Sequence, residues 1–371
     1  MGKLVAFRVD STIEMGTGHL VRCLTLAGEL RRAGAAAYFI SRKLPGGGEA
    51  LVRQSGFELL LLPEPKGGLQ TAREHERWLG VPWKQDAAET SEALRALSKP
   101  PDWLIVDHYG IDDRWESLVR TGMSKLMVID DLADRKHMAD LLLDQNVYPN
   151  MERRYDGLVP QACLRLLGPL YALVRPEFLE IRRPAWKPPE PGRERLLVFL
   201  GGADAQDQTS KVLRALNSFA DGQRFIDVVI GSANPHRAAV VQLCAAMQGV
   251  RVHQQTQDMA VLMSGAHLAI GGGGTTTWER CLLGLPSITL VMAQNQRAAT
   301  EAVAAAGATI NLGWFEGVRE EAIQQTVLKC FKNPTAMKAM SKAALGLMGG
   351  NRYEGASGVS QRMLEKDHAA A

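Results

Sequence analysis

The chain has 371 residues, of which 46% are hydrophobic and 22% charged, and its formal net charge is +3. This length predicts a core divided between two domains, and the composition excludes a disordered chain, a coiled coil and a fibre. The near balance of 43 basic and 40 acidic side chains argues against a nucleic-acid-binding or polybasic membrane protein, and no apolar run is long enough to form a transmembrane helix.

Short apolar runs alternate with stretches of helical periodicity in the first half of the chain. The runs predict strands over 4–9, 36–40, 59–62, 104–106, 126–129 and 141–143. A helix is expected directly after the first strand and another near 87–97, inside the least regular segment, 63–101. All-apolar strands separated by helices are typical of a parallel sheet that is buried on both faces.

A proline-rich segment then interrupts the pattern. Residues 182–195 contain four prolines and seven charged side chains, which predicts an exposed interdomain linker. The alternation resumes afterwards, with strands predicted over 196–200, 225–230, 250–253, 267–270 and 287–292. We therefore predict an α/β protein in which two Rossmann-like, doubly wound domains face a cleft. The predicted parts are a domain over 1–181, the linker over 182–195, a second domain over 196–335 and a helical extension over 336–371.

The first strand is followed by Gly16-Thr17-Gly18-His19, which opens a helix. Glycines let backbone N–H groups approach an anion, and a helix start carries partial positive charge, so Gly16 and Gly18 are candidate phosphate contacts. The same field should favour the neutral form of His19, which is the form that a general base needs. The alternative is an ordinary strand-to-helix turn. The motif is not the G-x-G-x-x-G pattern of dinucleotide-binding domains.

A second glycine-rich turn, 271–274, follows the strand predicted over 267–270. Consecutive glycines are costly in conformational entropy, and close approach of the backbone to a diphosphate would account for them. The threonines that follow can cap the next helix, and Glu279, about one turn along that helix, can accept hydrogen bonds from a ribose diol. The alternative is a flexible loop with an exposed glutamate. The candidate contacts in this turn are Gly272, Gly273, Gly274, Thr275 and Thr276.

Polar groups follow three further strands. They are Asp107-His108-Tyr109, Asp130-Asp131 and Gln294-Asn295. In a doubly wound sheet the carboxyl ends of the strands line the ligand site, although capped or solvated turns would also account for these residues. Amides both donate and accept hydrogen bonds, so Gln294 suits a sugar hydroxyl or an acetamido group.

We expect chemistry without a metal ion or cofactor. The chain has no Asp-x-Asp pair, no H-E-x-x-H, no P-loop and no His/Cys cluster. Its five cysteines are widely spaced and odd in number, which argues against a disulfide framework. The first residues lack the features of a secretory signal, so we expect a cytoplasmic protein.

Several motifs taken together resemble a known family. The amino-terminal set is R-x-D-S followed by G-x-G-H, which contributes Arg8, Asp10, Ser11, Gly16, Gly18 and His19. Further matches are Asp107-His108-Tyr109, the stretch 168–175 (GPLYALVR), Gly201-Gly202-Ala203-Asp204 and the stretch 271–291 (GGGGTTTWERCLLGLPSITLV). From about residue 3 to 310 the sequence resembles the UDP-sugar hydrolases of pseudaminic acid biosynthesis, which have a GT-B glycosyltransferase-like fold.

The resemblance implies metal-independent hydrolysis of a UDP-linked 2,4-diacetamido-2,4,6-trideoxy-β-L-altropyranose, with inversion, in a pathway that serves flagellin glycosylation. It assigns the water-activating base to His19, its companion to Asn295, the active-site tyrosine to Tyr109 and the uridine-side carboxylate to Glu279. Asp10 is expected to contact the substrate. Asp207 stands where the family has an asparagine that contacts the substrate.

Two other functions share these features. One is a GT-B glycosyltransferase that transfers the sugar to a separate acceptor, and the other is an inert nucleotide-sugar-binding module. In each case the expected partner is a small-molecule UDP-sugar. We expect a monomer that binds neither nucleic acid nor a membrane.

Overall fold

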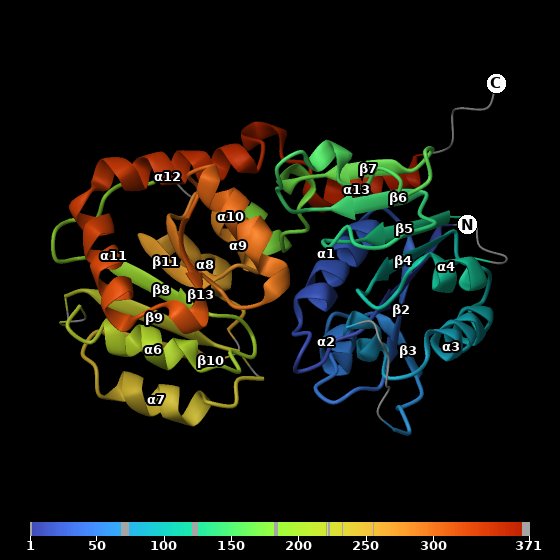
Figure 1. The fold of residues 1–371 in the computed structure, drawn as a ribbon, viewed down its shortest axis with the longest axis horizontal. Coiled ribbons are helices and arrows are strands. Elements are labelled where there is room, and N and C mark those ends of the chain that lie inside the picture. Colours follow the sequence, from blue (N-terminus) through green and yellow to red (C-terminus); the bar gives the residue numbers. More distant parts are fainter. Residues whose placement is uncertain are drawn as a thin grey trace. The chain divides into compact units, whose positions relative to one another are not determined.

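The computed structural model describes residues 2–67, 74–120, 125–181, 185–219, 221, 223–231, 233–254 and 256–365. The chain divides into two compact units (Figure 1). The first consists of Met1–Leu173 together with Glu354–Ala371, and the second of Val174–Tyr353.

The first unit is built on a seven-stranded parallel sheet in the order β3-β2-β1-β4-β5-β6-β7. Its strands are β1 Leu4–Val9, β2 Ala36–Arg42, β3 Glu58–Leu62, β4 Trp103–Asp107, β5 Lys125–Ile129, β6 Leu141–Asp144 and β7 Leu164–Leu167. Its helices are α1 Gly18–Arg32, α2 Glu49–Gln54, α3 Trp83–Arg95, α4 Asp113–Val119 and α13 Gly355–Leu364, with 3₁₀ turns η1 Glu74–Leu79, η2 Met151–Arg153 and η3 Pro169–Tyr171.

Helices cover both faces of this sheet, as the all-apolar strands predict. Successive side chains of a strand point to opposite faces. In β1, Val5 and Phe7 therefore pack into the core shared with α1 and α13, whereas Ala6 packs into the core shared with α3 and α4. The strand order reverses between β1 and β4, because the chain runs outward from β1 through β2 to β3 before β4 pairs on the other side of β1. Ligands of doubly wound sheets bind at the carboxyl ends of the strands around such a reversal.

The second unit contains a six-stranded parallel sheet in the order β10-β9-β8-β11-β12-β13. Its strands are β8 Arg195–Phe199, β9 Phe225–Ile230, β10 Val250–Gln254, β11 Leu268–Gly272, β12 Ser287–Val291 and β13 Ile310–Trp314. Its helices are α5 Pro176–Glu180, α6 Gln208–Ala215, α7 Arg237–Ala245, α8 Met259–Gly265, α9 Thr276–Leu282, α10 Arg297–Ala305, α11 Glu320–Lys332 and α12 Pro334–Leu347, with 3₁₀ turns η4 Gln294–Gln296, η5 Phe315–Gly317 and η6 Gly350–Arg352.

The boundary between the units differs from the predicted one. The chain passes from the first unit to the second between Leu173 and Val174, ahead of the proline-rich segment 182–195. The described part of that segment belongs to the second unit, because Trp186 buries its ring in that unit's core and its Nε1 donates to the carbonyl of His267 over 2.9 Å. Residues 182–184 lie outside the described residues.

The end of the chain is helical, as predicted, but it is not one extension. Helix α12 belongs to the second unit and α13 to the first. Val359 and Met363 of α13 pack in the core beside α1, and the carbonyl of Met363 accepts hydrogen bonds from Lys3 Nζ (3.1 Å) and Trp103 Nε1 (3.0 Å). The last helix thus completes one face of the amino-terminal sheet.

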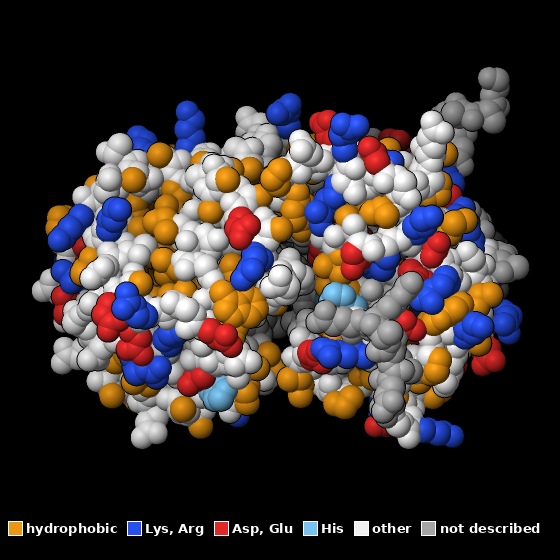
Figure 2. All heavy atoms as spheres, viewed as in Figure 1, with side chains coloured by type: hydrophobic (Ala, Val, Ile, Leu, Met, Phe, Trp, Pro, Cys, Tyr) orange, Lys and Arg blue, Asp and Glu red, His pale blue; other side chains and the backbone are white. Residues whose placement is uncertain are grey.

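Charged side chains of both signs are interspersed over the surface that Figure 2 colours by residue type, which agrees with the near-neutral composition. Within the described ranges, no helix is both long enough and apolar enough to cross a bilayer.

Candidate active site

Four neighbouring strands of the first sheet end in buried aspartates. Asp10 follows β1, Asp107 ends β4, Asp130 and Asp131 follow β5, and Asp144 ends β6. The strand order places these carboxylates in a row along the carboxyl edge of the sheet. A buried carboxylate requires hydrogen-bond or ion-pair partners. The side chains that pair with these aspartates form the candidate site.

His19 faces one of these aspartates. It is the second residue of α1, and Gly16, which has a φ of +71°, lets the chain turn into that helix. The ring Nδ1 lies 2.6 Å from Oδ1 of Asp107, and the histidine side chain is 9% exposed. A carboxylate only accepts hydrogen bonds, so Nδ1 carries the proton of the neutral ring and Nε2 keeps its lone pair. The sequence suggests a histidine controlled by the helix start alone, whereas the structure adds a histidine–aspartate pair.

Arg22, one helical turn after His19, holds this aspartate from the other side. Its Nε and Nη2 donate to the two oxygens of Asp107 over 2.6 Å each, and its Nη1 donates to Asp131 over 2.9 Å. Burial by itself would raise the pKa of Asp107, but Arg22 and His19 outweigh it and hold that pKa well below its usual range. Asp107 is therefore a fixed negative charge beneath the histidine ring.

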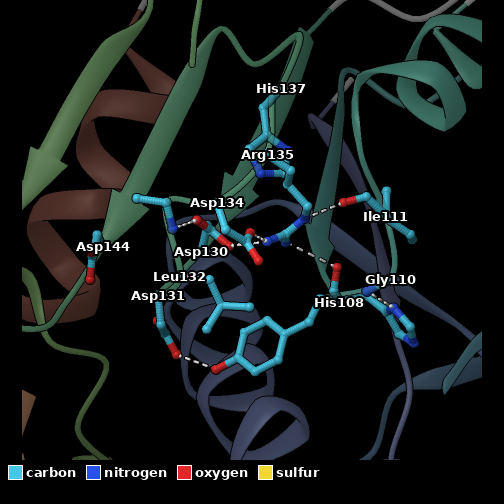
Figure 3. Close-up of polar contacts among 12 residues, drawn as sticks. His108, Gly110, Ile111, Asp130, Asp131, Leu132, Asp134, Arg135, His137 and Asp144 are labelled. Atoms are coloured by element: carbon cyan, nitrogen blue, oxygen red, sulfur yellow. Dashed lines mark hydrogen bonds and ion pairs between the residues drawn. The ribbon is translucent and has the colours of Figure 1, made fainter. Parts of the chain in front are cut away.

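Tyr109 completes this cluster. Its hydroxyl donates to Oδ2 of Asp131 over 2.7 Å, and its ring meets that of His19 edge to face, with centroids 4.6 Å apart. Near the end of the neighbouring strand β5, Arg135 donates to the carbonyl of Ile111 over 2.7 Å and pairs with Asp130 over 2.9 Å (Figure 3). The sequence motifs contain His19, Asp107 and Tyr109, and the structure brings all three together.

Asp10, a predicted substrate contact, takes a supporting position. Its carboxylate is fully buried and accepts from Arg8 Nη1 over 2.6 Å and from the backbone N–H of Arg42 over 2.7 Å. Arg8 and Arg42 also share Asp86 of α3. Burial raises the pKa of Asp86, but the two guanidinium groups outweigh it and lower the value to about 2. This network joins β1 to β2 and α3, and it leaves Asp10 no surface for a ligand.

In the second unit the glycine-rich turn joins β11 to α9. None of its four glycines has a positive φ. Close packing accounts for Gly273, where a Cβ would stand 2.2 Å from the hydroxyl oxygen of Thr300, and a Cβ at Gly272 would stand 3.3 Å from the side chain of Met292. At Gly274 a Cβ would make only an ordinary contact of 3.7 Å with Gln296. The turn also lies beside η4, since a Cβ at Gly273 would be 3.3 Å from the Cβ of Gln296. Gln296 thus lies next to Gly273 and Gly274, and Gln294 and Asn295 precede it in η4.

The predicted capping by threonine is wrong. Thr275 occupies the N-cap position of α9, but its side chain makes no capping hydrogen bond. The hydroxyls of Thr276 and Thr277 instead accept from the guanidinium of Arg280, over 3.2 and 3.1 Å. The arginine sits one turn further along the helix and draws both hydroxyl oxygens toward itself.

Glu279 is buried, not exposed as the loop alternative requires. Its Oε1 accepts from Arg175 Nε over 2.7 Å, whereas Oε2 is buried and has no partner among the described residues. Burial raises the pKa of Glu279, and Arg175 opposes that shift. One carboxylate oxygen is therefore fixed, and the other retains its capacity to accept hydrogen bonds.

Asp207 occupies the N-cap position of α6 in a left-handed conformation, with a φ of 49°, but it makes no capping bond. Asp204 takes that role by accepting from the backbone N–H groups of Gln208 and Thr209, both over 2.9 Å. Oδ1 of Asp207 is buried and has no partner within the described ranges. A non-glycine residue held at positive φ is strained, and such strain gathers at functional sites.

No group of three or more His, Cys, Asp or Glu side chains in the described part of the chain is arranged to hold a metal ion. The described cysteines are all free and buried.

Comparisons with known proteins cover both units. The family described as "Glycosyltransferase family 28 C-terminal domain" matches residues 195–357. The chain is 24% identical over 98% of its length to the "Spore coat polysaccharide biosynthesis protein SpsG" of Bacillus subtilis, of which it covers 99%. It is 25% identical over 75% of its length to the "UDP-2,4-diacetamido-2,4,6-trideoxy-beta-L-altropyranose hydrolase" of Campylobacter jejuni, of which it covers 88%.

Solved structures show the fold. The structure of Acinetobacter baumannii MurG is similar, with a TM-score of 0.64 and 16% identity, over 97% of this chain and 99% of that one. A kitacinnamycin glycotransferase is similar with a TM-score of 0.65 and 17% identity, over 98% of this chain and 99% of that one. The chain therefore has the GT-B glycosyltransferase fold, with two Rossmann-like units, and its residues 195–357 match the C-terminal domain of glycosyltransferase family 28.

Proposed function

We propose that the protein hydrolyses a UDP-linked 2,4-diacetamido-2,4,6-trideoxy sugar of the β-L-altropyranose type to UDP and the free sugar. The observation that carries the proposal is the His19–Asp107 pair, with 2.6 Å between Nδ1 and Oδ1. A histidine held by a carboxylate at Nδ1 presents Nε2 as a general base. The relative of 25% identity is named a hydrolase of this UDP-sugar, which supports the choice of substrate.

The proposed reaction is a single displacement at the anomeric carbon. Nε2 of His19 accepts a proton from water while the water oxygen bonds to that carbon. The bond to the diphosphate oxygen breaks, and its electron pair leaves with UDP, so the sugar configuration inverts. The imidazolium that forms is stabilised by Asp107, which Arg22 keeps ionised and in place.

Nucleotide recognition falls to the second unit in this proposal. The backbone between Gly272 and Thr276 would hold the diphosphate, and the unpartnered Oε2 of Glu279 would accept from the ribose diol. Gln294 and Asn295 of η4 would recognise sugar hydroxyl or acetamido groups. Asp207 can only accept hydrogen bonds when ionised, so in this role it would face a donor such as an acetamido N–H.

The test is UDP release from the UDP-sugar in the absence of any acceptor. Wild-type protein should release UDP and free sugar in equal amounts. His19→Gln should fold normally and lose about 10²–10⁴-fold in rate, the usual contribution of a general base. The matched control is His137→Gln, because His137 Nδ1 also lies 2.6 Å from a buried carboxylate, Glu116 Oε1, but takes no part in the His19–Asp107 pair. Full activity of His19→Gln would remove His19 from the reaction.

A transferase is the second candidate, and the similarity to MurG and to a family of glycosyltransferases favours it. It would use the same nucleotide contacts, and His19 would deprotonate an acceptor hydroxyl instead of water. Strict dependence of UDP release on an added acceptor would establish the transferase and refute the hydrolase.

A further inference from the structure

Arg280 is a buried cation in the second unit whose hydrogen-bond partners are all neutral. It lies on α9 and is 2% exposed. Its Nη2 donates to the carbonyl of Gly272 over 3.0 Å and to the hydroxyl of Thr277 over 3.1 Å, and its Nη1 donates to the hydroxyl of Thr276 over 3.2 Å. Among the residues that the structure describes, no carboxylate lies within ion-pair distance, and Nε has no partner.

This arrangement leaves positive charge uncompensated inside the unit. The nearest acid along the chain, Glu279, is already engaged by Arg175 over 2.7 Å. Glu279 thus forms its ion pair with Arg175 and none with Arg280. Burial lowers the pKa of Arg280, which is the direction expected for a cation that lacks a counter-charge. A buried charge without a partner is expensive, and arginine does not escape the cost by losing its proton near neutral pH.

The guanidinium lies against the backbone of the glycine-rich turn. A Cβ at Gly271 would stand 2.6 Å from Nη1 of Arg280 and 3.1 Å from the carbonyl oxygen of Phe199. The missing side chain at position 271 thus makes room for the arginine. The position of Arg280 therefore explains why residue 271, the first of the four glycines, has no side chain, which the sequence alone does not show.

We propose that Arg280 is a positioning residue that supplies a buried counter-charge for the diphosphate of the bound nucleotide. The inference rests on the proposed function, because it takes the turn between Gly272 and Thr276 as the diphosphate site. Three acceptors hold the guanidinium in place, and its burial protects its field from screening by salt. The diphosphate then provides the negative charge that the free protein lacks at this point.

Arg280 also orients a donor at the turn. A hydroxyl oxygen that accepts a hydrogen bond from a guanidinium keeps its own hydrogen free to donate. Thr276 is half-buried, so its hydroxyl hydrogen remains available to an anion at the surface of the turn. The arginine thus acts through its charge and through Thr276 without contacting the phosphates itself.

The experiment compares UDP, UMP and uridine binding to wild-type protein, Arg280→Gln and Arg280→Lys, by calorimetry and ligand-observed NMR. Arg280→Gln should weaken UDP binding by about tenfold or more, UMP binding less, and uridine binding hardly at all. Arg280→Lys keeps the charge and should retain most of the UDP affinity, and it also serves if the glutamine variant does not fold. Arg214→Gln is the control, since Arg214 is 52% exposed and pairs with Glu320 on the surface.

Two outcomes would contradict the proposed role of Arg280 as a counter-charge. One is unchanged UDP affinity in Arg280→Gln. The other is an equal loss for UDP and uridine, which would mean that Arg280 only braces the turn. If the wild-type protein binds none of the three ligands, the proposed function itself fails, and this result is distinct from both.

Discussion

Replacing Asp107 by asparagine tests the proposed active site most directly. Asp107 Oδ1 accepts from His19 Nδ1 and Arg22 Nη2, and Oδ2 accepts from Arg22 Nε, each over 2.6 Å. An amide nitrogen can accept at neither position. In one orientation of the asparagine, its NH2 group faces the guanidinium of Arg22. In the other it faces Nδ1 of His19, so the ring proton must move to Nε2, and Nε2 can then no longer act as the base.

The carboxylate that stabilises the imidazolium disappears in both orientations. Loss of the equivalent aspartate in histidine-based hydrolases lowers turnover by up to about 10⁴-fold. We expect about 10³-fold for Asp107→Asn, which corresponds to about 4 kcal/mol of transition-state stabilisation at 1.36 kcal/mol per factor of ten. KM should change little, because in our assignment Asp107 does not contact the substrate.

The assay is UDP release under saturating substrate, with the free energy of unfolding measured in urea for each variant. Glu116→Gln is the control, since it breaks the buried His137–Glu116 pair with the same 2.6 Å separation elsewhere in the first unit. Both variants should lose stability, but only Asp107→Asn should lose turnover. Turnover within about threefold of wild type in Asp107→Asn, at a pH where the protein is folded, would refute the pairing as the source of the base.

Two further predictions concern stability. Burial first, and then repulsion from Asp131, raise the pKa of Asp144 to about 8. The folded state therefore binds a proton on the Asp144 carboxyl group more tightly than the unfolded chain does. The stability that this proton contributes is lost as the pH rises toward about 8. Asp144→Asn should gain stability over wild type across that range in urea unfolding, and a pH-independent difference would contradict the assignment. Gly231→Ala should lose about 1–3 kcal/mol, because its Cβ would stand 2.1 Å from the carbonyl oxygen of Gly202. Gly28→Ala, in α1 with nothing within 4 Å, should gain about 0.5–1 kcal/mol in the same measurement, and equal effects of the two would argue against close packing as the cause.

Most of the strands that the sequence predicts are central strands buried on both faces, although the edge strands Glu58–Leu62 and Val250–Gln254 are predicted as well. Leu4–Val9 and Phe225–Ile230 are observed with the predicted bounds. The two missed strands, Leu164–Leu167 and Ile310–Trp314, lie at sheet edges. An edge strand needs no continuous apolar run. Arg165 interrupts the first, and Gly313, with a φ of 92°, lies at the register shift of the second.

The candidate residues themselves are visible in the sequence, but their partners are not. His19 and Glu279 stand in recognisable motifs, because a glycine-rich turn after an apolar strand is typical of the ligand-binding loops of doubly wound sheets. Arg22 pairs with a residue 85 positions away, and Arg175 with one 104 positions away. Such ion pairs depend on which strands are neighbours in the sheet, and this information is not local. The i, i+3 spacing of His19 and Arg22 on one helix was the available signal for that pair.

The distribution of buried charge indicates which unit should hold the anion. In the first unit four aspartates along the sheet edge pair with guanidinium groups: Asp10 with Arg8, Asp107 and Asp131 with Arg22, and Asp130 with Arg135. A diphosphate there would have to compete with carboxylates already in place. In the second unit Arg280 lies behind the glycine-rich turn with neutral partners only among the described residues. An anion gains most where the protein has left a fixed cation without a counter-charge, so we expect the diphosphate of the proposed substrate to bind at the turn of the second unit.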